Sequence, residues 1–268
     1  QMTEFFNLTG PSQAIDLISD QVTNVSTEKV ETFQSLGRIM AETVIADGPI
    51  PQFVRSSMDG YSVRASDTFG ATETLPAYLE VIGEIAMGVS SDISIKHGEA
   101  AIAYTGGMLA QAADAVVMVE HTEVTTGQLL QVFRPVAIGE NTIPAGDDFA
   151  EGSIIVENGS IINEKLIGSL LVNGITSSKV FRRPTVAVLS AGDELVHPGC
   201  YPTPGKVRDI NLYTIASSVR AMGANVKLYP RQSDEFEEQL AVARNAISDC
   251  DVLVFTSGSS ISARDLTA

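Results

Sequence analysis

Three short loops carry residue types that could hold a phosphorylated small molecule. They are residues 190–194 (Ser-Ala-Gly-Asp-Glu), 230–234 (Pro-Arg-Gln-Ser-Asp) and 256–260 (Thr-Ser-Gly-Ser-Ser). Small residues let a ligand approach backbone N–H groups, and carboxylates can hold a divalent cation. One such loop alone is more often a plain turn. Three of them, each after an apolar segment, favour a binding site.

The segments around these loops predict a parallel α/β sheet. Residues 185–189, 226–229 and 251–255 are apolar runs typical of buried strands, and helices are predicted over 211–222 and 234–247 between them. This alternation calls for right-handed crossovers and parallel strands. Ligands of such sheets bind outside the carboxyl ends of the strands, so the three loops are expected to meet there.

The earlier part of the chain has a different pattern. Helices are predicted over residues 10–22 and 35–42, and a loop rich in proline and glycine follows at 46–51. Short strand-like segments punctuated by glycines then predict a small β-barrel: residues 78–85, 100–104, 115–119 and 129–133. A strand-like piece at 153–156 and a helix over 165–172 indicate a return to the first domain.

We therefore predict a mixed α/β, multi-domain fold. A discontinuous α+β linker and dimerisation domain takes residues 1–54 and 139–179, with an inserted β-barrel domain at 55–138. Residues 180–268 form a three-layer α/β domain with a mainly parallel sheet, incomplete at its C-terminal end. A three-stranded sheet would leave an exposed edge, so we expect a fragment of a longer protein.

Composition narrows the classes of function. The formal net charge of −16 repels nucleic acid and anionic membrane surfaces, whereas local backbone donors can still bind an anionic metabolite. No apolar run approaches the roughly 18–20 residues that cross a bilayer, and no secretory signal is present, which predicts a cytoplasmic protein. Cys200 and Cys250 are expected to be ordinary reduced thiols, and three scattered histidines argue against zinc.

Charged residues near the predicted sheet have two interpretations. Arg182 and Arg183 precede its first strand and are read as a solvated edge at the amino end. Lys206 and Arg208 lie on the side of the loops and are candidate anion contacts, with a plain surface role equally open.

Five motifs occur in a fixed order along the chain. They are residues 57–61 (Ser-Met-Asp-Gly-Tyr), 104–107 (Tyr-Thr-Gly-Gly) with 112–117, 139–141 with 145–148, 183–184 leading to 190–195, and Ser257-Gly258 after an apolar strand. From about residue 10 to the end, this series resembles the MoeA family of molybdopterin molybdenumtransferases, relatives of the gephyrin E domain.

The resemblance implies insertion of molybdate into adenylated molybdopterin, with Mg²⁺-dependent release of AMP. It also implies a homodimer whose sites form between subunits, and a possible handover of substrate from a pterin adenylyltransferase. By the same resemblance the catalytic residues are Asp59, Asp148 and Glu194, and the metal ligands are Asp234 and Asp265. The implied substrate-binding residues are Thr105, Gly106, Gly192, Asp193, Asp209, Asn211, Ser257, Gly258 and Ser259.

Some positions depart from the family's pattern. Ser259 stands where the family usually has glycine, Ala191 replaces a threonine, and Ser233 replaces one of a pair of aspartates. The lysines expected to hold the pterin phosphate would lie beyond Ala268. Two other functions remain open: a non-catalytic pterin-binding or scaffold protein on the same fold, and another enzyme sharing only the α/β domain, like a pterin adenylyltransferase or CinA-type pyrophosphatase.

Overall fold

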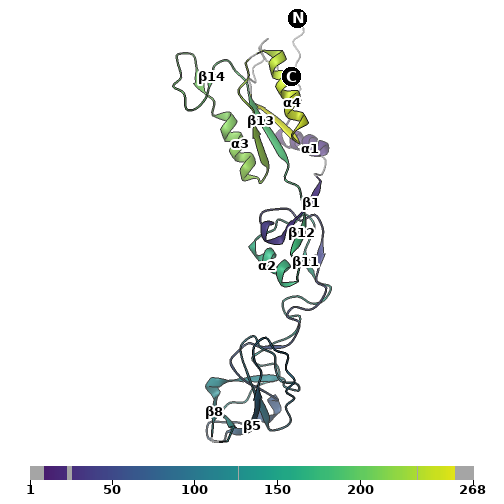
Figure 1. The fold of residues 1–268 in the computed structure, drawn as a ribbon, viewed down its shortest axis with the longest axis vertical. Coiled ribbons are helices and arrows are strands. Elements are labelled where there is room, and N and C mark those ends of the chain that lie inside the picture. Colours follow the sequence, from purple (N-terminus) through teal and green to yellow (C-terminus); the bar gives the residue numbers. More distant parts are fainter. Residues whose placement is uncertain (1–8, 23–25, 126, 234, 257–268) are drawn as a thin grey trace. The chain divides into compact units, whose positions relative to one another are not determined.

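The computed structural model describes residues 9–22, 26–125, 127–233 and 235–256 (Figure 1). Its contacts divide the chain into two units. The first comprises the described residues of Gln1–Glu42, Gly159–Asn163 and Ser177–Ala268, and the second comprises those of Thr43–Asn158 and Glu164–Thr176. The chain therefore leaves the first unit and returns to it. The three domain boundaries drawn from the sequence stay a prediction.

The C-terminal part of the first unit is the predicted parallel sheet. Its central strand β13 (Thr185–Ser190) pairs in parallel with β16 (Asn225–Leu228) on one side and β17 (Val252–Thr256) on the other. The crossovers are helices α3 (Asn211–Ala221) and α4 (Phe236–Ser248), and Figure 1 shows them on either side of β13. The predicted order of strands and helices is confirmed.

Apolar burial explains this arrangement. The strand β13 is buried from Val186 to Ser190, because neighbours cover it along both edges. On one face, Val186 and Val188 pack against Leu212 of α3. Gly223 follows α3 in a left-handed conformation (φ +88°), which ends the helix and turns the chain into β16. A small parallel pair, β14 (Leu195–Val196) with β15 (Val207–Arg208), extends from the loop after β13.

The remainder of the first unit holds α1 (Pro11–Gln21) and an antiparallel pair, β1 (Thr27–Glu31) with β12 (Ser177–Phe181). The helix predicted over 35–42 is wrong. The chain instead forms a 3₁₀ turn, η1 (Thr32–Gln34), and then pairs its backbone with distant segments. Gly37 has a φ of +71°, and the Met40 N–H donates to the Ser160 carbonyl at 2.9 Å, so long-range pairing prevails over helical spacing.

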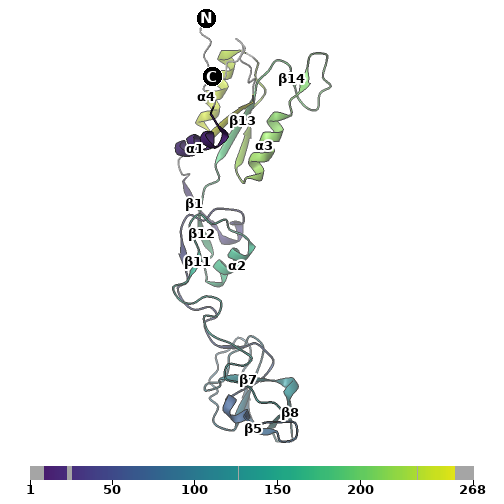
Figure 2. The same cartoon turned by 180° about the vertical axis from the view of Figure 1, so that it is seen from behind.

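The second unit contains a six-stranded sheet in the order β7-β4-β6-β5-β9-β8. Figure 2 shows β5, β7 and β8 of this sheet. The strands are β4 (Gly60–Val63), β5 (Ala77–Glu84), β6 (Glu99–Ala103), β7 (Ala115–Met118), β8 (Thr122–Val124) and β9 (Leu129–Val132). All four strands predicted in this region are present.

The chain connection between the two edge strands shows that this sheet is curled. Strands β7 and β8 are joined only by η3 (Val119–His121), and four peptide steps span at most about 15 Å. In a flat sheet the edges of six strands would be about 24 Å apart. The sheet therefore bends into a half-barrel around a core that includes Val63, Leu79 and Leu130. The predicted fold class, mixed α/β with several domains, is confirmed.

Short antiparallel pairs continue the second unit: β2 (Val44–Ile45) with β11 (Ile154–Val156), and β3 (Arg55–Ser56) with β10 (Thr142–Ile143). The other elements there are η2 (Ala65–Thr68) and α2 (Glu164–Val172), which matches the predicted helix. Among the described helices of the whole chain, none is long and apolar enough to cross a membrane.

Candidate functional site

The second unit, called the half-barrel unit from here on, holds an exposed carboxylate, that of Asp59, directly before β4. Its Oδ1 accepts hydrogen bonds from the Thr105 backbone N–H at 2.8 Å and from the Thr105 hydroxyl at 2.9 Å. The backbone bond, and then the side-chain bond, lower the pKa of Asp59 below 3.8. We call this arrangement the Asp59 corner. Asp59 is ionised at neutral pH and held in one orientation.

Gly60 makes that position possible. A Cβ atom at Gly60 would lie 1.9 Å from the Val117 carbonyl oxygen of β7, so no other residue fits while β4 and β7 pair. The turn that carries Thr105 is fixed as well. The Gly106 N–H donates to the Ser56 carbonyl at 2.7 Å, and Gly106 has a φ of +82°. The turn before β4 and the turn after β6 are therefore held against each other by hydrogen bonds at the Asp59 corner.

Two further polar contacts involve residues next to this corner in the sequence. The Tyr104 hydroxyl donates to Glu84 at 2.7 Å, and this bond raises the pKa of Tyr104. Arg55, directly before Ser56, lies 3.8 Å from the carboxylate of Asp148. The structure thus brings together Asp59, Thr105 and Gly106, three of the residues that the sequence singled out, and Asp148 lies in the same unit, near Arg55.

The first unit contains the parallel sheet and is called the α/β unit from here on. In it, the loops after β13 and β16 meet at the carboxyl edge of the sheet. Gly192 is buried with a φ of +148°, and a Cβ there would lie 2.9 Å from the Glu194 carboxylate oxygens. Its N–H donates to the Gln232 carbonyl at 3.3 Å, and its carbonyl accepts from Arg231 at 3.0 Å. Two of the three predicted loops are therefore tied together, with Glu194 folded back over Gly192.

The third predicted loop lies mostly outside the described residues. This applies to Ser257, Gly258 and Ser259, and also to the predicted metal ligands Asp234 and Asp265. Thr256, the last described residue, accepts from the Ala191 N–H at 3.4 Å, so this strand end reaches the same edge. Among the described residues, no group of three or more His, Cys, Asp or Glu side chains could hold a metal ion.

Asp209 is buried, with 5% of its surface exposed, at the start of α3. Its carboxylate accepts from the Ser190 hydroxyl at the end of β13 and from the Leu212 N–H at 3.2 Å. Both oxygens therefore have partners within the protein, and the carboxylate joins the end of the strand to the helix that follows. Asn211, the first residue of α3, and Asp193 in the Gly192 loop are both exposed.

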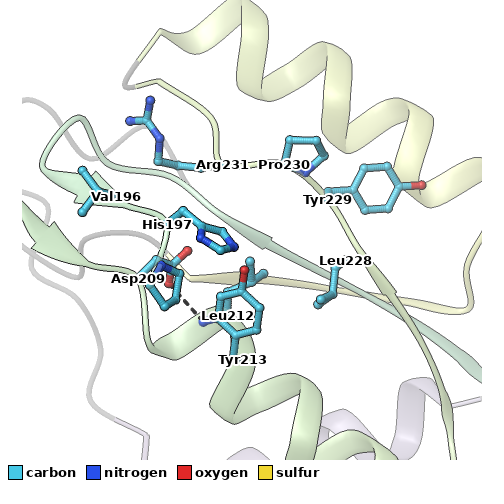
Figure 3. Close-up of a pocket in the computed structure, with 10 residues that line it drawn as sticks. Val196, His197, Asp209, Leu212, Tyr213, Leu228, Tyr229, Pro230 and Arg231 are labelled. Atoms are coloured by element: carbon cyan, nitrogen blue, oxygen red, sulfur yellow. Dashed lines mark hydrogen bonds between the residues drawn. The ribbon is translucent and has the colours of Figure 1, made fainter. Parts of the chain in front are cut away.

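A cavity of about 420 Å³ opens beside this carboxylate, between α3, the residues after β14 and the end of β16 (Figure 3). His197 and Tyr213 form one wall, their ring centroids 6.2 Å apart and their planes at 87°. Pro230 and Arg231 line it from the connection after β16. Sequence reasoning missed this cavity, because its aromatic residues come from separate elements and belong to no motif.

The basic residues near the sheet form hydrogen bonds and ion pairs within the protein. The amine of Lys206 donates to the Asp193 carbonyl at 2.5 Å, and Arg208 donates to the carbonyls of Pro198 and Cys200. Both side chains therefore brace the loop beside the cavity. Arg182 lies at the amino edge of the sheet, as predicted, and there makes a solvent-exposed bidentate ion pair with Asp251 at 2.7 and 2.9 Å, which the sequence did not indicate. Arg183 is exposed, as predicted.

The fold and these sites define a class of protein. It is a multi-domain α/β protein with a cavity of small-molecule size at the carboxyl edge of a parallel sheet, and with a fixed carboxylate in a separate β unit.

Comparison with known proteins gives the family. Residues 10–174 match the family described as "MoeA N-terminal region (domain I and II)", and residues 187–268 match "Probable molybdopterin binding domain". The chain therefore belongs to the MoeA family of molybdopterin biosynthesis proteins.

Individual relatives agree with this assignment. The chain is 34% identical over 251 residues to a molybdopterin molybdenumtransferase of Staphylococcus epidermidis, a match that covers 93% of this chain and 59% of that protein. Two crystal structures of molybdopterin biosynthesis MoeA proteins from Pyrococcus horikoshii are also similar. One has a TM-score of 0.85 at 29% identity, covering 94% of this chain and 67% of that one. The other has 0.81 at 32% identity, covering 94% and 64%.

Proposed function

We propose that this chain acts in molybdenum cofactor biosynthesis as a molybdopterin molybdenumtransferase. The reaction inserts molybdate into adenylated molybdopterin and releases AMP. The observation that carries the proposal is the Asp59 corner, where two hydrogen bonds from Thr105 hold an ionised, exposed carboxylate. The S. epidermidis relative named molybdopterin molybdenumtransferase supports it. Because the chain spans 59% of that relative's length, the whole activity is proposed here.

The lowered pKa of Asp59 indicates how this residue acts. A carboxylate with a lowered pKa is a weak base but is ionised throughout the physiological range. Its proposed role is therefore to orient a hydrogen-bond donor of the substrate, such as a dithiolene S–H group, rather than to abstract a proton by itself. Thr105 keeps the carboxylate in place, and Asp148, whose carboxylate lies 3.8 Å from Arg55, adds a second negative charge in the same unit.

In the α/β unit, Glu194, Gly192, Asp193 and Asn211 are proposed to bind the substrate at the carboxyl edge of the sheet, and Asp209 to hold that edge in shape. Magnesium belongs to the proposal through Asp234 and Asp265, and when bound it would neutralise charge at the phosphoanhydride. A homodimer, whose sites combine the α/β domain of one subunit with the β domain of the other, is also proposed. A pterin adenylyltransferase is the proposed donor of substrate.

The test is molybdate-dependent release of AMP from adenylated molybdopterin. It is run on this chain and on a version continued to the length of the relatives, with Mg²⁺ present. We expect release by the longer version at least. Pterin binding by both versions without release would contradict the proposal and favour the scaffold alternative. The alternative of an enzyme sharing only the α/β domain does not account for the family match over residues 10–174.

A further inference from the structure

A second cavity of the α/β unit lies at the amino edge of its parallel sheet, where β12 leads into β13. Its volume is about 410 Å³, within the range of small-molecule sites. Four segments line it: the end of α1, the turn after η1, the connection between β12 and β13, and the turn after α3. We call it the amino-edge cavity. It shares no residue with the cavity beside Asp209, which lies at the carboxyl edge of the sheet.

The walls of the amino-edge cavity are mostly apolar. Phe181 and Pro184 come from the connection between the strands, and Val22, Ile39 and Met222 come from the other three segments. The last three side chains are exposed, although each is apolar. A ligand with an apolar body would cover them, and the removal of their surface from water would favour binding.

Three arginines form the charged part of the lining. They are Arg38, Arg182 and Arg183, and the same three residues line an adjacent hollow of about 470 Å³ with more polar walls. Two carboxylates oppose them, because Glu28 pairs with Arg38 and Asp251 pairs with Arg182. Three guanidinium groups and two carboxylates leave one excess positive charge. In a chain with a net charge of −16, this local excess favours an anion.

Two of the guanidinium groups have N–H donors without an acceptor. Only 10% of the Arg38 side chain is exposed, and its Nη2 donates to Glu28 and to the Phe181 carbonyl. Its buried Nε has no hydrogen-bond partner in the described part of the chain. Arg183 is exposed, and among the described residues its side chain has no acceptor. Because an unpaired buried N–H costs free energy, a ligand that brings oxygen acceptors to these arginines would stabilise the lining.

The charges and the apolar walls together select a class of ligand. Guanidinium groups match the geometry of a carboxylate and also stack on flat rings, as Phe181 does. A polyphosphate would place several negative charges near Glu28 and Asp251, and one excess positive charge does not neutralise them. A cationic ligand would be repelled by the excess charge. The features therefore favour a ligand with one negative charge and an apolar ring.

We propose that the amino-edge cavity binds a small aromatic monocarboxylate, with its ring among Phe181, Ile39 and Met222 and its carboxylate beside Arg183. This site goes beyond the proposed function and does not depend on it, since the residues assigned to molybdopterin in this unit lie at the opposite edge of the sheet. Bound ligand would connect segments on both sides of the β12–β13 connection, so it should also raise the thermal midpoint of the α/β unit.

The experiment is an NMR titration of the chain with phenylbutyrate. Phenylbutanol and phenylbutylamine have the same body without the negative charge and serve as comparison ligands. We expect phenylbutyrate to bind about tenfold more tightly than the alcohol, because of the added hydrogen bonds to a charged group, and the amine to bind most weakly. Amide shifts should move at residues 37–39 and 222–224 and stay unchanged at 190–194. Equal affinity for the acid and the alcohol, or shifts confined to 190–194, would overturn the proposal.

Two variants separate the carboxylate from the ring. Arg183→Gln should weaken phenylbutyrate about tenfold and leave phenylbutanol unchanged. Met222→Gln should weaken both ligands about threefold, because apolar contact with the ring is lost. Arg220→Gln is the matched control, since Arg220 is also exposed and does not line the cavity. Circular dichroism melts check the folding of each variant.

Two outcomes of these titrations count against the assignment. If folded Arg183→Gln binds phenylbutyrate as tightly as the unmodified chain, the carboxylate is not at Arg183 and the proposal fails. If inorganic pyrophosphate displaces phenylbutyrate and binds more tightly, the site prefers a polyanion and the monocarboxylate assignment is overturned. Neither outcome affects the proposed function, which is measured separately as release of AMP.

Discussion

Asp59 of the half-barrel unit and Asp209 of the α/β unit are carboxylates held by two hydrogen bonds each, yet their surroundings differ. Asp59 is exposed, and both bonds come from Thr105 to a single oxygen, so the other oxygen faces solvent. Asp209 is buried, and its two oxygens have one partner each. The first geometry leaves an acceptor for a substrate. The second uses the carboxylate to shape the wall of a cavity.

The surroundings of these two carboxylates, the Asp59 corner and the α/β cavity, also differ in how they are built. The Asp59 corner is built from backbone pairing and a glycine with no space for a side chain, and it presents charge. The α/β cavity is built from side chains of separate elements, and it presents aromatic surface. Under the proposed function, the fixed charge and the aromatic cavity therefore belong to different units, and variants in each unit test whether they act separately.

The largest effect is expected from Gly60→Ala. A Cβ 1.9 Å from the Val117 carbonyl oxygen forces β4 away from β7, and we expect a loss of about 3 kcal/mol in the stability of the half-barrel. Hydrogen exchange should show faster exchange in β4, β6 and β7 with β13 unchanged, and AMP affinity should persist. Gly48→Ala is the control, because nothing lies within 4 Å of its added Cβ. Faster exchange in β13 would show that the two units do not fold independently.

Next is Asp59→Asn, which keeps the shape of the side chain and removes its charge. We expect molybdate-dependent AMP release to fall about a hundredfold, since a fixed charge at the reacting groups is lost. The thermal midpoint should fall slightly, because the hydrogen bonds from Thr105 to a charged acceptor are weakened, whereas the Kd for AMP should stay unchanged, because the residue belongs to the other unit. Asp92→Asn, at another exposed acid of the same unit, should retain full activity. Loss of AMP affinity in Asp59→Asn would contradict the division of roles.

A smaller effect is expected from Thr105→Val, which removes the hydroxyl bond to Asp59 and keeps the backbone bond. The pKa of Asp59 should rise toward 3.8, and AMP release should fall about tenfold because the carboxylate is less fixed. Carboxyl NMR titration measures this pKa. Thr105→Ser, which retains the hydroxyl, should restore both values. An unchanged pKa in Thr105→Val would show that the backbone bond alone orients Asp59.

The way in which folding stability depends on pH through Asp59 follows from the direction of its pKa shift. Its pKa in the folded protein is below 3.8, so the stabilisation is complete above 3.8 and is lost as the pH falls through the lower value. In Thr105→Val the pH range over which this stabilisation is lost becomes narrower, because the folded and unfolded pKa values of Asp59 approach each other.

The sequence predicted the α/β topology well, because its strands are continuous apolar runs with helical spacing between them. Its turn motifs, which resemble those of a family, singled out Asp59 and Thr105 as separate site residues, but the hydrogen bonds between them became visible only in the structure. It could not predict the irregular course of residues 35–42, where Gly37 and pairing across more than a hundred residues decide the structure. The cavity was also missed, since His197, Tyr213 and Arg231 meet only when three elements pack.

The smallest effect is expected at Asp251, a carboxylate with a structural role that contrasts with the functional role proposed for Asp59. The pKa of Asp251 is lowered to about 2 by its hydrogen bonds, first from Arg182 and then from the Thr185 N–H. Like Asp59, this acid has a depressed pKa, but its cause is an ion pair between the segment after β12 and the residue before β17. We therefore expect Asp251→Asn to reduce the stability of the first unit without affecting AMP release.

At pH 7 we expect Asp251→Asn to lower the free energy of unfolding by about 1 kcal/mol. The loss is small because the side chains of Arg182 and Asp251 are about one-third exposed, so solvent screens much of their interaction. The folded pKa lies below the unfolded value of 3.8, so the difference between the variant and the unmodified chain should be complete above pH 4. It should fade as the pH falls toward 2, as measured by hydrogen exchange in β13 and β17. Asp249→Asn, at a more exposed pair with Lys227, should cost less than about 0.5 kcal/mol. A difference for Asp251→Asn that persists at pH 2 would mean that packing, and not charge, stabilises this edge of the sheet.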